Sequence, residues 1–297
     1  MFIKDYKNLI LKESIDKSIE LSLESCKRLL ESAAIMACSD SDNHRIISLN
    51  ISSKIIELSN NDFLRSIGEF ILTRLGNFPL LIMSKNEFNI PDYFNILEDK
   101  YPISLPSKLR GEAIFKKSIN KITIGDELIY LTDFQSRVIN NLKIGKNISI
   151  AAPTSAGKSY ILLKYITNFI KNHNKKCIII YIVPTRALIS QVQRDLKREL
   201  EKYSMRDIQV HSSSNYAIEV QEQKSSKAIL VLTPERLQII RSNINKLKVD
   251  LLIVDETQKI EEGSRGIALE ECVQQVVDLN PLSQYIFISP FARNLEE

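Results

Sequence analysis

The sequence has little of what disulfide frameworks, zinc sites and membrane spans require. Its 297 residues include four cysteines, which are far apart and form no CxxC pair, and three histidines that share no metal-ligand spacing. This scarcity argues against a disulfide-stabilised fold or a structural zinc site and favours a reducing, cytoplasmic location. The longest apolar run, 177–183, has seven residues, whereas a membrane helix needs about 20. Asp5 and Glu13 interrupt the N-terminal apolar residues, so we expect no signal peptide.

Glycine is also scarce, with 8 residues, and neither sign of charge dominates. The net charge is +4, and hydrophobic and charged residues make up 44% and 26% of the chain, which excludes wholesale disorder. Residues 111–297 carry 26 basic against 21 acidic side chains, whereas residues 1–110 carry 14 against 15. A mildly basic C-terminal part allows contact with a polyanion, although an ordinary solvated surface is the simpler explanation of the charge alone.

Hydrophobic periodicity divides the chain into two regions. Within 1–84, apolar residues recur three and four positions apart, which predicts packed amphipathic helices. Asn61 is typical of a helix N-cap, and Gly76 is typical of a helix end. The proline-containing stretch 85–110 is predicted to be a linker or an edge-packing segment. We therefore expect a helical region and its linker over 1–110 and a second domain over 111–297.

The second region alternates between short apolar runs and helical stripes. Continuous runs rich in β-branched residues are typical of strands that are buried on both faces of a parallel sheet. The predicted strands are 147–151, 177–183, 208–211, 228–232, 250–254 and 284–288. This pattern predicts an α/β fold in which helices flank a parallel sheet and the ligand site lies at the carboxyl ends of the strands.

The strongest local motif follows the first predicted strand. Residues 152–159, Ala-Pro-Thr-Ser-Ala-Gly-Lys-Ser, fit a P-loop with Ala152 at its first glycine position. Such a loop directs backbone N–H groups at phosphates and leads into a helix N-terminus, which favours negative charge. We expect Lys158 to contact the β- and γ-phosphates of ATP and Ser159 to bind the accompanying Mg²⁺. The other predicted nucleotide contacts are Thr154, Ser155, Ala156 and Gly157.

A second motif consists of two carboxylates, Asp255 and Glu256, at the end of an apolar strand. Asp255 is placed to hold Mg²⁺, and Glu256 is placed to orient or deprotonate an attacking water. An acidic strand end that faces solvent is a common alternative, but the P-loop earlier in the chain favours the catalytic interpretation. Lys158, Asp255 and Glu256 are therefore the predicted catalytic residues.

Taken in order, these motifs resemble the superfamily 2 nucleic-acid helicases of the DExH/DEAD type, and within them the superkiller-like group. The resemblance covers about residues 130–297, and the ordered series is more specific than any single motif. Its parts are FQ (134–135) as the Q motif, APTSAGKS (152–159) as motif I, VPTRALISQ (183–191) as motif Ia, LTPERL (232–237) as motif Ib, DETQ (255–258) as motif II, GSRGIALE (263–270) after motif II, and ISPFARN (288–294) as motif III.

The resemblance implies a RecA-like P-loop domain that forms the ATP-binding half of an ATP-dependent helicase or translocase acting on DNA or RNA. It implies that Gln135 reads adenine and that Gln258 and Ser289 couple hydrolysis to strand movement. The residues it places on the phosphates of one strand are Thr185, Arg186, Thr233 and Arg236. The family's stabilising arginine comes from a second RecA-like domain, which we expect C-terminal to this chain, so the chain alone should hydrolyse ATP slowly.

Two motifs depart from the family pattern. Gln258 stands where DExH enzymes have His, and Ser289-Pro290-Phe291 stands where most have Ser/Thr-Ala-Thr. These changes put efficient unwinding in doubt, but not ATP binding. Two alternatives stay open: an ATP-gated nucleic-acid clamp or scaffold that switches a partner without unwinding, and a P-loop ATPase or kinase that acts on no nucleic acid. Such motif III variants are similar to those of bacterial anti-phage defence helicases, including the Hachiman type, which would imply a defence-system effector as partner.

Overall fold

The computed structural model describes residues 4–7, 9, 22–85, 107–153, 156–173, 176–213, 227–240, 248–258 and 263–290. The chain forms two compact units. The first, here the helical unit, comprises Met1–Thr123 and Glu127–Ser136, and the second, here the sheet unit, comprises Ile124–Asp126 and Arg137–Glu297. The helical unit thus continues past residue 110, because the helix that contains this residue packs against the N-terminal helices.

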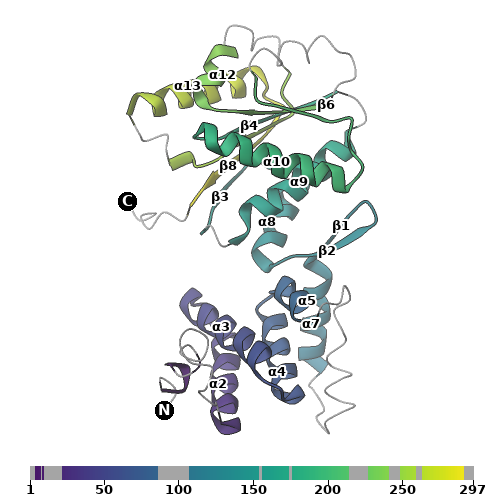
Figure 1. Ribbon diagram of the computed structural model, residues 1–297, viewed down its shortest axis with the longest axis vertical. Helices are drawn as coiled ribbons and strands as arrows, with labels where there is room; N and C mark the ends of the chain where they lie inside the picture. Colours follow the sequence, from purple (N-terminus) through teal and green to yellow (C-terminus); the bar gives the residue numbers. More distant parts are fainter. Residues whose placement is uncertain are drawn as a thin grey trace. The chain divides into compact units, whose positions relative to one another are not determined.

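The helical unit consists of amphipathic helices and a two-stranded sheet (Figure 1). Its elements are α2 (Leu23–Met36), α3 (Asp42–Leu58), α4 (Asp62–Arg74), α5 (Phe78–Lys85), α7 (Ser107–Ile119), β1 (Lys121–Ile124) and β2 (Glu127–Tyr130). The sequence predicted the helices within 1–84 but neither α7 nor the two strands. The first residues of α7, 107–110, belong to a helix and not to the predicted linker, and β1 and β2 fall in a stretch of mixed composition. Most of the predicted linker, 86–106, lies outside the described residues.

The core of the helical unit lies between α2, α3 and α4. Leu29 of α2, Ile51 and Ile55 of α3 and Leu64 of α4 belong to one cluster of fully buried side chains. The Asn61 side chain caps α4 by accepting hydrogen bonds from the backbone N–H groups of the second and third residues of the helix, at 2.9 and 3.3 Å. This confirms the predicted N-cap, which satisfies donors that the helix cannot pair internally.

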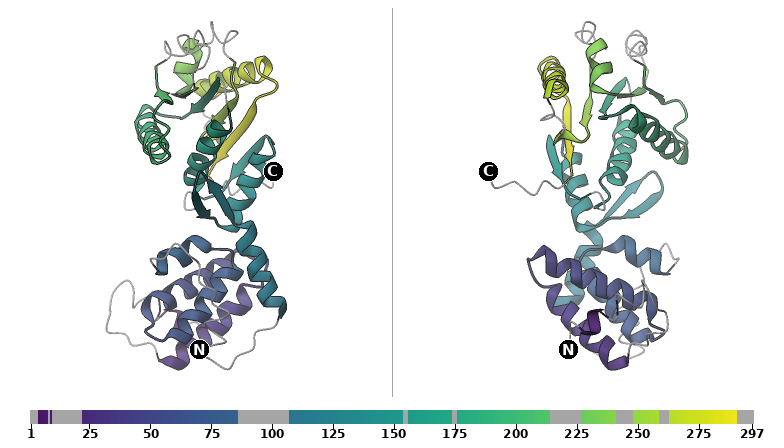
Figure 2. Two further views of the ribbon diagram at one scale, coloured as in Figure 1. Left: turned by 90° about the vertical axis from the view of Figure 1, so that its right-hand side faces the viewer. Right: turned by 60° about the vertical axis from the view of Figure 1, so that its left-hand side comes forward.

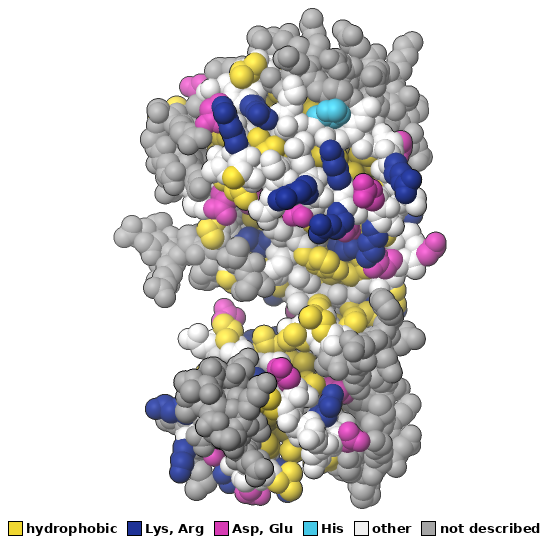
Figure 3. All heavy atoms as spheres, viewed as in Figure 1, with side chains coloured by type: hydrophobic (Ala, Val, Ile, Leu, Met, Phe, Trp, Pro, Cys, Tyr) yellow, Lys and Arg dark blue, Asp and Glu magenta, His cyan; other side chains and the backbone are white. Residues whose placement is uncertain are grey.

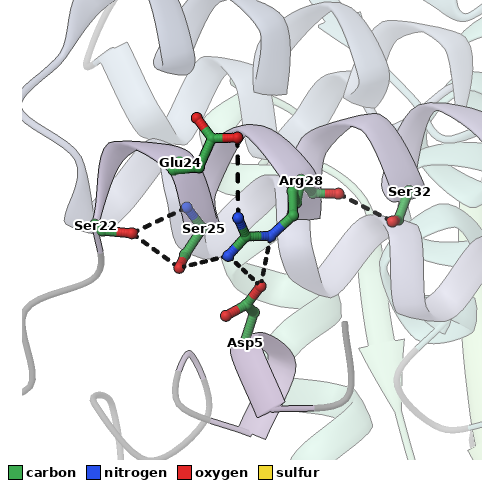
Figure 4. Close-up of polar contacts among 6 residues, drawn as sticks. All are labelled: Asp5, Ser22, Glu24, Ser25, Arg28 and Ser32. Atoms are coloured by element: carbon green, nitrogen blue, oxygen red, sulfur yellow. Dashed lines mark hydrogen bonds and ion pairs between the residues drawn. The ribbon is translucent and has the colours of Figure 1, made fainter. Parts of the chain in front are cut away.

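An ion pair joins the N-terminal segment to α2 (Figure 4). Two guanidinium nitrogens of Arg28 donate to one carboxylate oxygen of Asp5 at 3.1 and 3.0 Å. The Asp5 side chain is only 8% exposed, and a carboxylate that has lost its water needs such a charged partner. The Ser22 hydroxyl accepts the backbone N–H of Ser25 and so caps the same helix.

The sheet unit carries the predicted α/β architecture. Its elements are α8 (Asp133–Lys143, which begins in the helical unit), β3 (Ile148–Ala151), α9 (Lys158–Asn172), β4 (Cys177–Ile182), α10 (Arg186–Lys202), β5 (Gln209–His211), β6 (Lys227–Leu232), α12 (Pro234–Ile240), β7 (Leu251–Val254), α13 (Gly263–Leu279) and β8 (Gln284–Ser289). Each observed strand lies within one residue of its predicted range, and the prediction of a parallel sheet flanked by helices is confirmed.

Helices cover both faces of this sheet, as Figures 1 and 2 show. Side chains of α12 and α13 pack on one face, where alternate residues of β4, β6 and β7 form a single buried cluster. On the other face, α9 and α10 lie against each other and α10 packs on β5 and β6. All six residues of β4 are buried, which explains why a strand with two covered faces is a continuous apolar run. No helix of the described part is both long and apolar enough to cross a bilayer.

The strand order places the motif-bearing loops along one edge of the sheet. The order is β3-β8-β7-β4-β6-β5, and all five neighbouring pairs are parallel. The register is even at the carboxyl ends: Ala151 pairs with Ser289, and Ile182 pairs with both Val254 and Leu232. The chain passes from β3 to β4 and later fills the gap with β7 and β8, which is the arrangement that opens a ligand crevice at strand ends.

We expect Gly76→Ala to destabilise the helical unit by ~2 kcal/mol or more. Gly76 has a φ of 70°, a left-handed conformation that costs an L-residue about 1–2 kcal/mol. An added Cβ would also overlap the carboxylate of Asp133. That carboxylate is held in place, because it accepts hydrogen bonds from Lys116 at 3.0 Å and from Asn120 at 2.6 Å.

Gly111→Ala in α7 is the matched control. Its new Cβ would meet nothing within 4 Å, and alanine stabilises a helix interior by about 1 kcal/mol relative to glycine. Urea unfolding of both variants measures the difference. A Gly76→Ala variant that is as stable as the wild type would contradict the expectation.

Candidate nucleotide and nucleic-acid site

The predicted P-loop connects β3 to α9. Its start is tied to the sheet, since the backbone N–H of Ala152 donates to the carbonyl of Ser289 at 3.4 Å, and the Ala156 N–H donates to the Pro153 carbonyl at 3.0 Å. Gly157 is the N-cap of α9 and has a φ of 75°. Because only glycine adopts this conformation without strain, the residue explains how the loop turns into the helix. Thr154 and Ser155 lie outside the described residues.

The two residues after Gly157 differ in exposure. Lys158 begins α9 and is only 8% exposed, and its Nζ donates to the carbonyl oxygen of Ala152 at the start of the same loop. Ser159 is exposed. The ammonium group is therefore held within the loop, whereas the Ser159 hydroxyl is accessible at the helix N-terminus, where the backbone N–H groups and the helix dipole favour an anion.

Asp255 lies directly after β7 and is supported on both carboxylate oxygens. Its Oδ1 accepts the backbone N–H of Glu256 at 2.9 Å, and its Oδ2 lies 3.4 Å from the hydroxyl of Tyr181 on β4. Sequence reasoning did not identify Tyr181 as part of the site. The available signal was a tyrosine within a run that is otherwise aliphatic, since a buried phenol usually requires a hydrogen-bond partner.

The electrostatics of this cluster favour a divalent cation beside the carboxylates. Burial raises the pKa of Asp255, as does the neighbouring Glu256, while the Glu256 N–H, Tyr181 and Lys158 act in the opposite direction. Burial also raises the pKa of Tyr181 well above its usual value, and the Asp255 charge adds to this shift. Two adjacent carboxylates in a partly desolvated place are the hard oxygen ligands that Mg²⁺ accepts, so these residues fit that metal.

The four residues of motif II form a turn with its own hydrogen bonds. Glu256 has a φ of 57°, and its Oε2 accepts the side-chain amide of Gln258 at 2.5 Å. The Thr257 hydroxyl donates to the carbonyl of Ile288 at 3.2 Å. The tie between motif II and the strand that carries motif III thus comes from Thr257, a residue that the motif comparison did not single out. The coupling role of Gln258 and Ser289 stays a prediction; 291–294 of motif III lie outside the described residues.

The predicted nucleic-acid residues follow β4 and β6. Thr185 is exposed and caps α10, where its hydroxyl accepts the Leu188 N–H at 3.5 Å, and Arg186 is exposed beside it. Thr233, by contrast, is only 2% exposed. Arg236 donates to the backbone carbonyl of Ser212 at 2.5 Å. The motif Ia pair therefore presents a hydroxyl and a guanidinium to solvent, and the motif Ib pair is engaged within the protein.

Gln135 belongs to the helical unit, whereas the other candidate residues belong to the sheet unit. It is 7% exposed. Its side-chain oxygen accepts the Thr132 N–H at 3.1 Å, and its backbone N–H donates to the Thr132 hydroxyl at 3.2 Å. These two bonds fix the first turn of α8 around the glutamine. Its role in reading adenine stays a prediction.

Comparison with protein families identifies the class to which this site belongs. A family model described as DEAD/DEAH box helicase matches residues 132–291, which is more than half of the chain. The chain therefore belongs to the DEAD/DEAH box helicase family. Membership confirms the predicted resemblance to superfamily 2 helicases and agrees with the RecA-like fold of the sheet unit.

Three curated proteins show the range of the similarity. The pre-mRNA-splicing factor brr2 of Schizosaccharomyces pombe is 29% identical over 143 residues, which cover 44% of this chain and 6% of that protein. The ATP-dependent DNA helicase Hel308 of Thermoplasma volcanium is 30% identical over 169 residues, with coverages of 56% and 24%. The DExH-box ATP-dependent RNA helicase DExH9 of Arabidopsis thaliana is 27% identical over 180 residues, with coverages of 60% and 16%. The chain spans less than a quarter of each relative.

We expect Asp255→Asn to raise the melting temperature at pH 7. Burial raises the pKa of the Asp255 carboxyl in the folded state, so the charged form destabilises the fold above the folded-state pKa. That penalty is absent at a pH below the pKa of aspartate in the unfolded chain, about 3.9, because the carboxyl is then neutral in both states. The stability gained by the neutral amide should therefore shrink as the pH falls from 7 towards 4.

Thermal unfolding across this pH range measures the effect, and Asp126→Asn at an exposed loop position is the matched control. We expect the control to change the melting temperature little at any pH. An Asp255→Asn variant that is less stable than the wild type at pH 7 would show that the buried charge does not carry this cost.

Proposed function

We propose that the sheet unit binds ATP and hydrolyses it as the ATP-binding half of a nucleic-acid helicase or translocase. The observation that carries the proposal is that the P-loop lysine and the motif II carboxylates follow the carboxyl ends of β3 and β7, the two strands that flank β8. The charge of Lys158 acts on the pKa of Asp255, and the loops that carry them are both tied to β8, by Ala152 and by Thr257. Family membership supports the same chemistry.

Each residue has a distinct task in this proposal. Lys158, which donates to the Ala152 carbonyl, exchanges that partner for the β- and γ-phosphates, while Gly157 allows the backbone to approach them. Ser159 and Asp255 would hold Mg²⁺, which when bound neutralises phosphate charge. Glu256 orients the attacking water and accepts its proton. Catalysis of this kind depends on positioning and charge stabilisation rather than on covalent chemistry.

Contact with a nucleic-acid strand is the second part of the proposal. Thr185 and Arg186 stand exposed at the N-terminus of α10, where a phosphate meets a hydroxyl, a guanidinium and a helix dipole. Basic side chains gather on the face of the sheet unit that Figure 3 shows. The exposed basic residues of α10 are Arg186, Arg194, Lys197, Arg198 and Lys202. Such a surface attracts a polyanion.

Three finer parts of the proposal rest on the sequence. The need for an arginine on the transferred phosphoryl group supports a second RecA-like domain as partner. The scattered cysteines support a cytoplasmic location. The motif III variant supports a role in antiviral defence with an effector as partner. A strand-displacement assay separates a helicase from an ATP-gated clamp that binds nucleic acid without unwinding it.

We expect Lys158→Ala to abolish ATP binding. The variant removes the only side-chain charge that the proposal places on the phosphates, and titration with a fluorescent ATP analogue measures the loss. Lys171→Ala, an exposed lysine at the other end of α9, is the matched control and should bind as the wild type does. Unchanged affinity of the Lys158 variant would refute the P-loop assignment.

We expect Arg186→Ala to weaken binding of single-stranded DNA and RNA and to reduce the salt dependence of the affinity by about one ion. Arg206→Ala is the control, because Arg206 is exposed just before β5, at the opposite edge of the sheet. Fluorescence anisotropy at several salt concentrations measures both variants. If the wild-type chain binds neither strand at low salt, the nucleic-acid part of the proposal fails and a P-loop ATPase or kinase replaces it.

A further inference from the structure

The side chain of Gln258 contacts the proposed general base directly. Its Nε2 donates to Oε2 of Glu256 at 2.5 Å, and the two residues are separated by one position in the motif II turn. The direction of the amide follows from chemistry, because the reversed amide would place its oxygen against a carboxylate oxygen, and both groups only accept hydrogen bonds. Nε2 is therefore the atom that faces Glu256.

The oxygen of the same amide lacks the hydrogen bond that its nitrogen has. Oε1 of Gln258 is buried and has no hydrogen-bond partner among the residues that the structure describes. Buried polar atoms are normally paired, and the bond to Glu256 is the hydrogen bond that the described residues provide to this amide. This arrangement distinguishes Gln258 from a side chain that merely fills space in the turn.

The backbone of the motif II turn is fixed independently of Gln258. The Glu256 φ of 57° places a non-glycine residue in the left-handed region, which is disfavoured and which directs the side chain differently from that of an extended strand residue. The turn itself is anchored separately, by the Thr257 hydroxyl on Ile288 and by the Asp255 carboxylate on the Glu256 N–H. Loss of the Gln258 amide should thus free the carboxylate without displacing the turn.

We propose that Gln258 is a positioning residue for hydrolysis: its amide fixes Oε2 of Glu256, which leaves Oε1 to accept the proton of the attacking water. The inference rests on the proposed function, in which Glu256 is the general base. It also gives Gln258 a role at the carboxylate itself, apart from the coupling to Ser289 that the sequence predicted. A base that is free to rotate spends less time in the reactive orientation, so hydrolysis slows while nucleotide binding is unchanged.

The test measures hydrolysis and binding separately in the full 297-residue chain. Single-turnover hydrolysis of radiolabelled ATP, with the chain in excess, gives the rate constant, and titration with a fluorescent ATP analogue gives the affinity. We expect Gln258→Ala to lower the rate constant on the order of tenfold, with the nucleotide affinity and the melting temperature unchanged. Gln258→His, which restores an N–H donor, should recover most of the rate, whereas Gln258→Glu, which has no donor, should not.

A matched control removes the same kind of bond elsewhere in the sheet unit. Gln274 on α13 donates its amide to the carboxylate of Asp278 at 2.7 Å on the exposed face of the helix. Gln274→Ala should hydrolyse ATP at the wild-type rate. A loss equal to that of Gln258→Ala would show that the effect is not specific to the motif II turn, and it would overturn the inference.

Glu256→Gln distinguishes a failure of the inference from a failure of the proposed function. If this variant hydrolyses ATP at the wild-type rate, Glu256 is not the base and the premise itself is wrong. If Glu256→Gln is slow but Gln258→Ala is not, the base stands and the positioning role is wrong. In the Glu256→Gln background, Gln258→Ala should cause no further loss; an equal further loss would mean that Gln258 acts independently of Glu256.

Discussion

The even register of the parallel sheet is the constraint on which the candidate site depends. Because β8 lies between β3 and β7 and the strand ends pair residue by residue, the P-loop, motif II and motif III emerge along one edge. A slip of one residue would move every side chain of a strand to the opposite face of the sheet, where it would meet a different set of packed neighbours, and close packing on both faces opposes this. The same packing that buries β4 completely therefore places Lys158 near two carboxylates.

Charged side chains lie partly buried at the carboxyl ends of the strands, and their burial determines how readily they ionise. Burial raises the pKa of Asp255, and the hydroxyl of Tyr181, the N–H of Glu256 and the charge of Lys158 compensate in part. The cluster combines one buried cation with two adjacent carboxylates, and a divalent cation would offset the excess negative charge and attract phosphate oxygens. Hydrogen bonds fix the turn from Asp255 to Gln258. The Asp255 carboxylate accepts the Glu256 N–H, the Gln258 amide donates to the Glu256 carboxylate, and the Thr257 hydroxyl donates to the end of β8.

Sequence patterns predicted the parts of the molecule that local physics determines. Patterns within a few residues predicted all six strands of the parallel sheet, the Asn61 cap and the motifs at the strand ends. The contact between Tyr181 and Asp255 joins residues 74 positions apart, so only the folded sheet reveals it. The burial of Thr233 depends likewise on packing rather than on its motif. Strands β1 and β2 were missed because they lie in a stretch of mixed composition that shows no clear period.

If the motif II carboxylates act on a nucleotide bound at the P-loop, loss of the Glu256 charge slows hydrolysis and leaves nucleotide binding intact. Single-turnover ATP hydrolysis by Glu256→Gln, with nucleotide affinity measured on the same preparation, tests it most directly. We expect ATP binding equal to that of the wild type and hydrolysis slower by roughly a hundredfold or more, the usual contribution of a general base. Hydrolysis at the wild-type rate, with binding intact, would contradict this expectation.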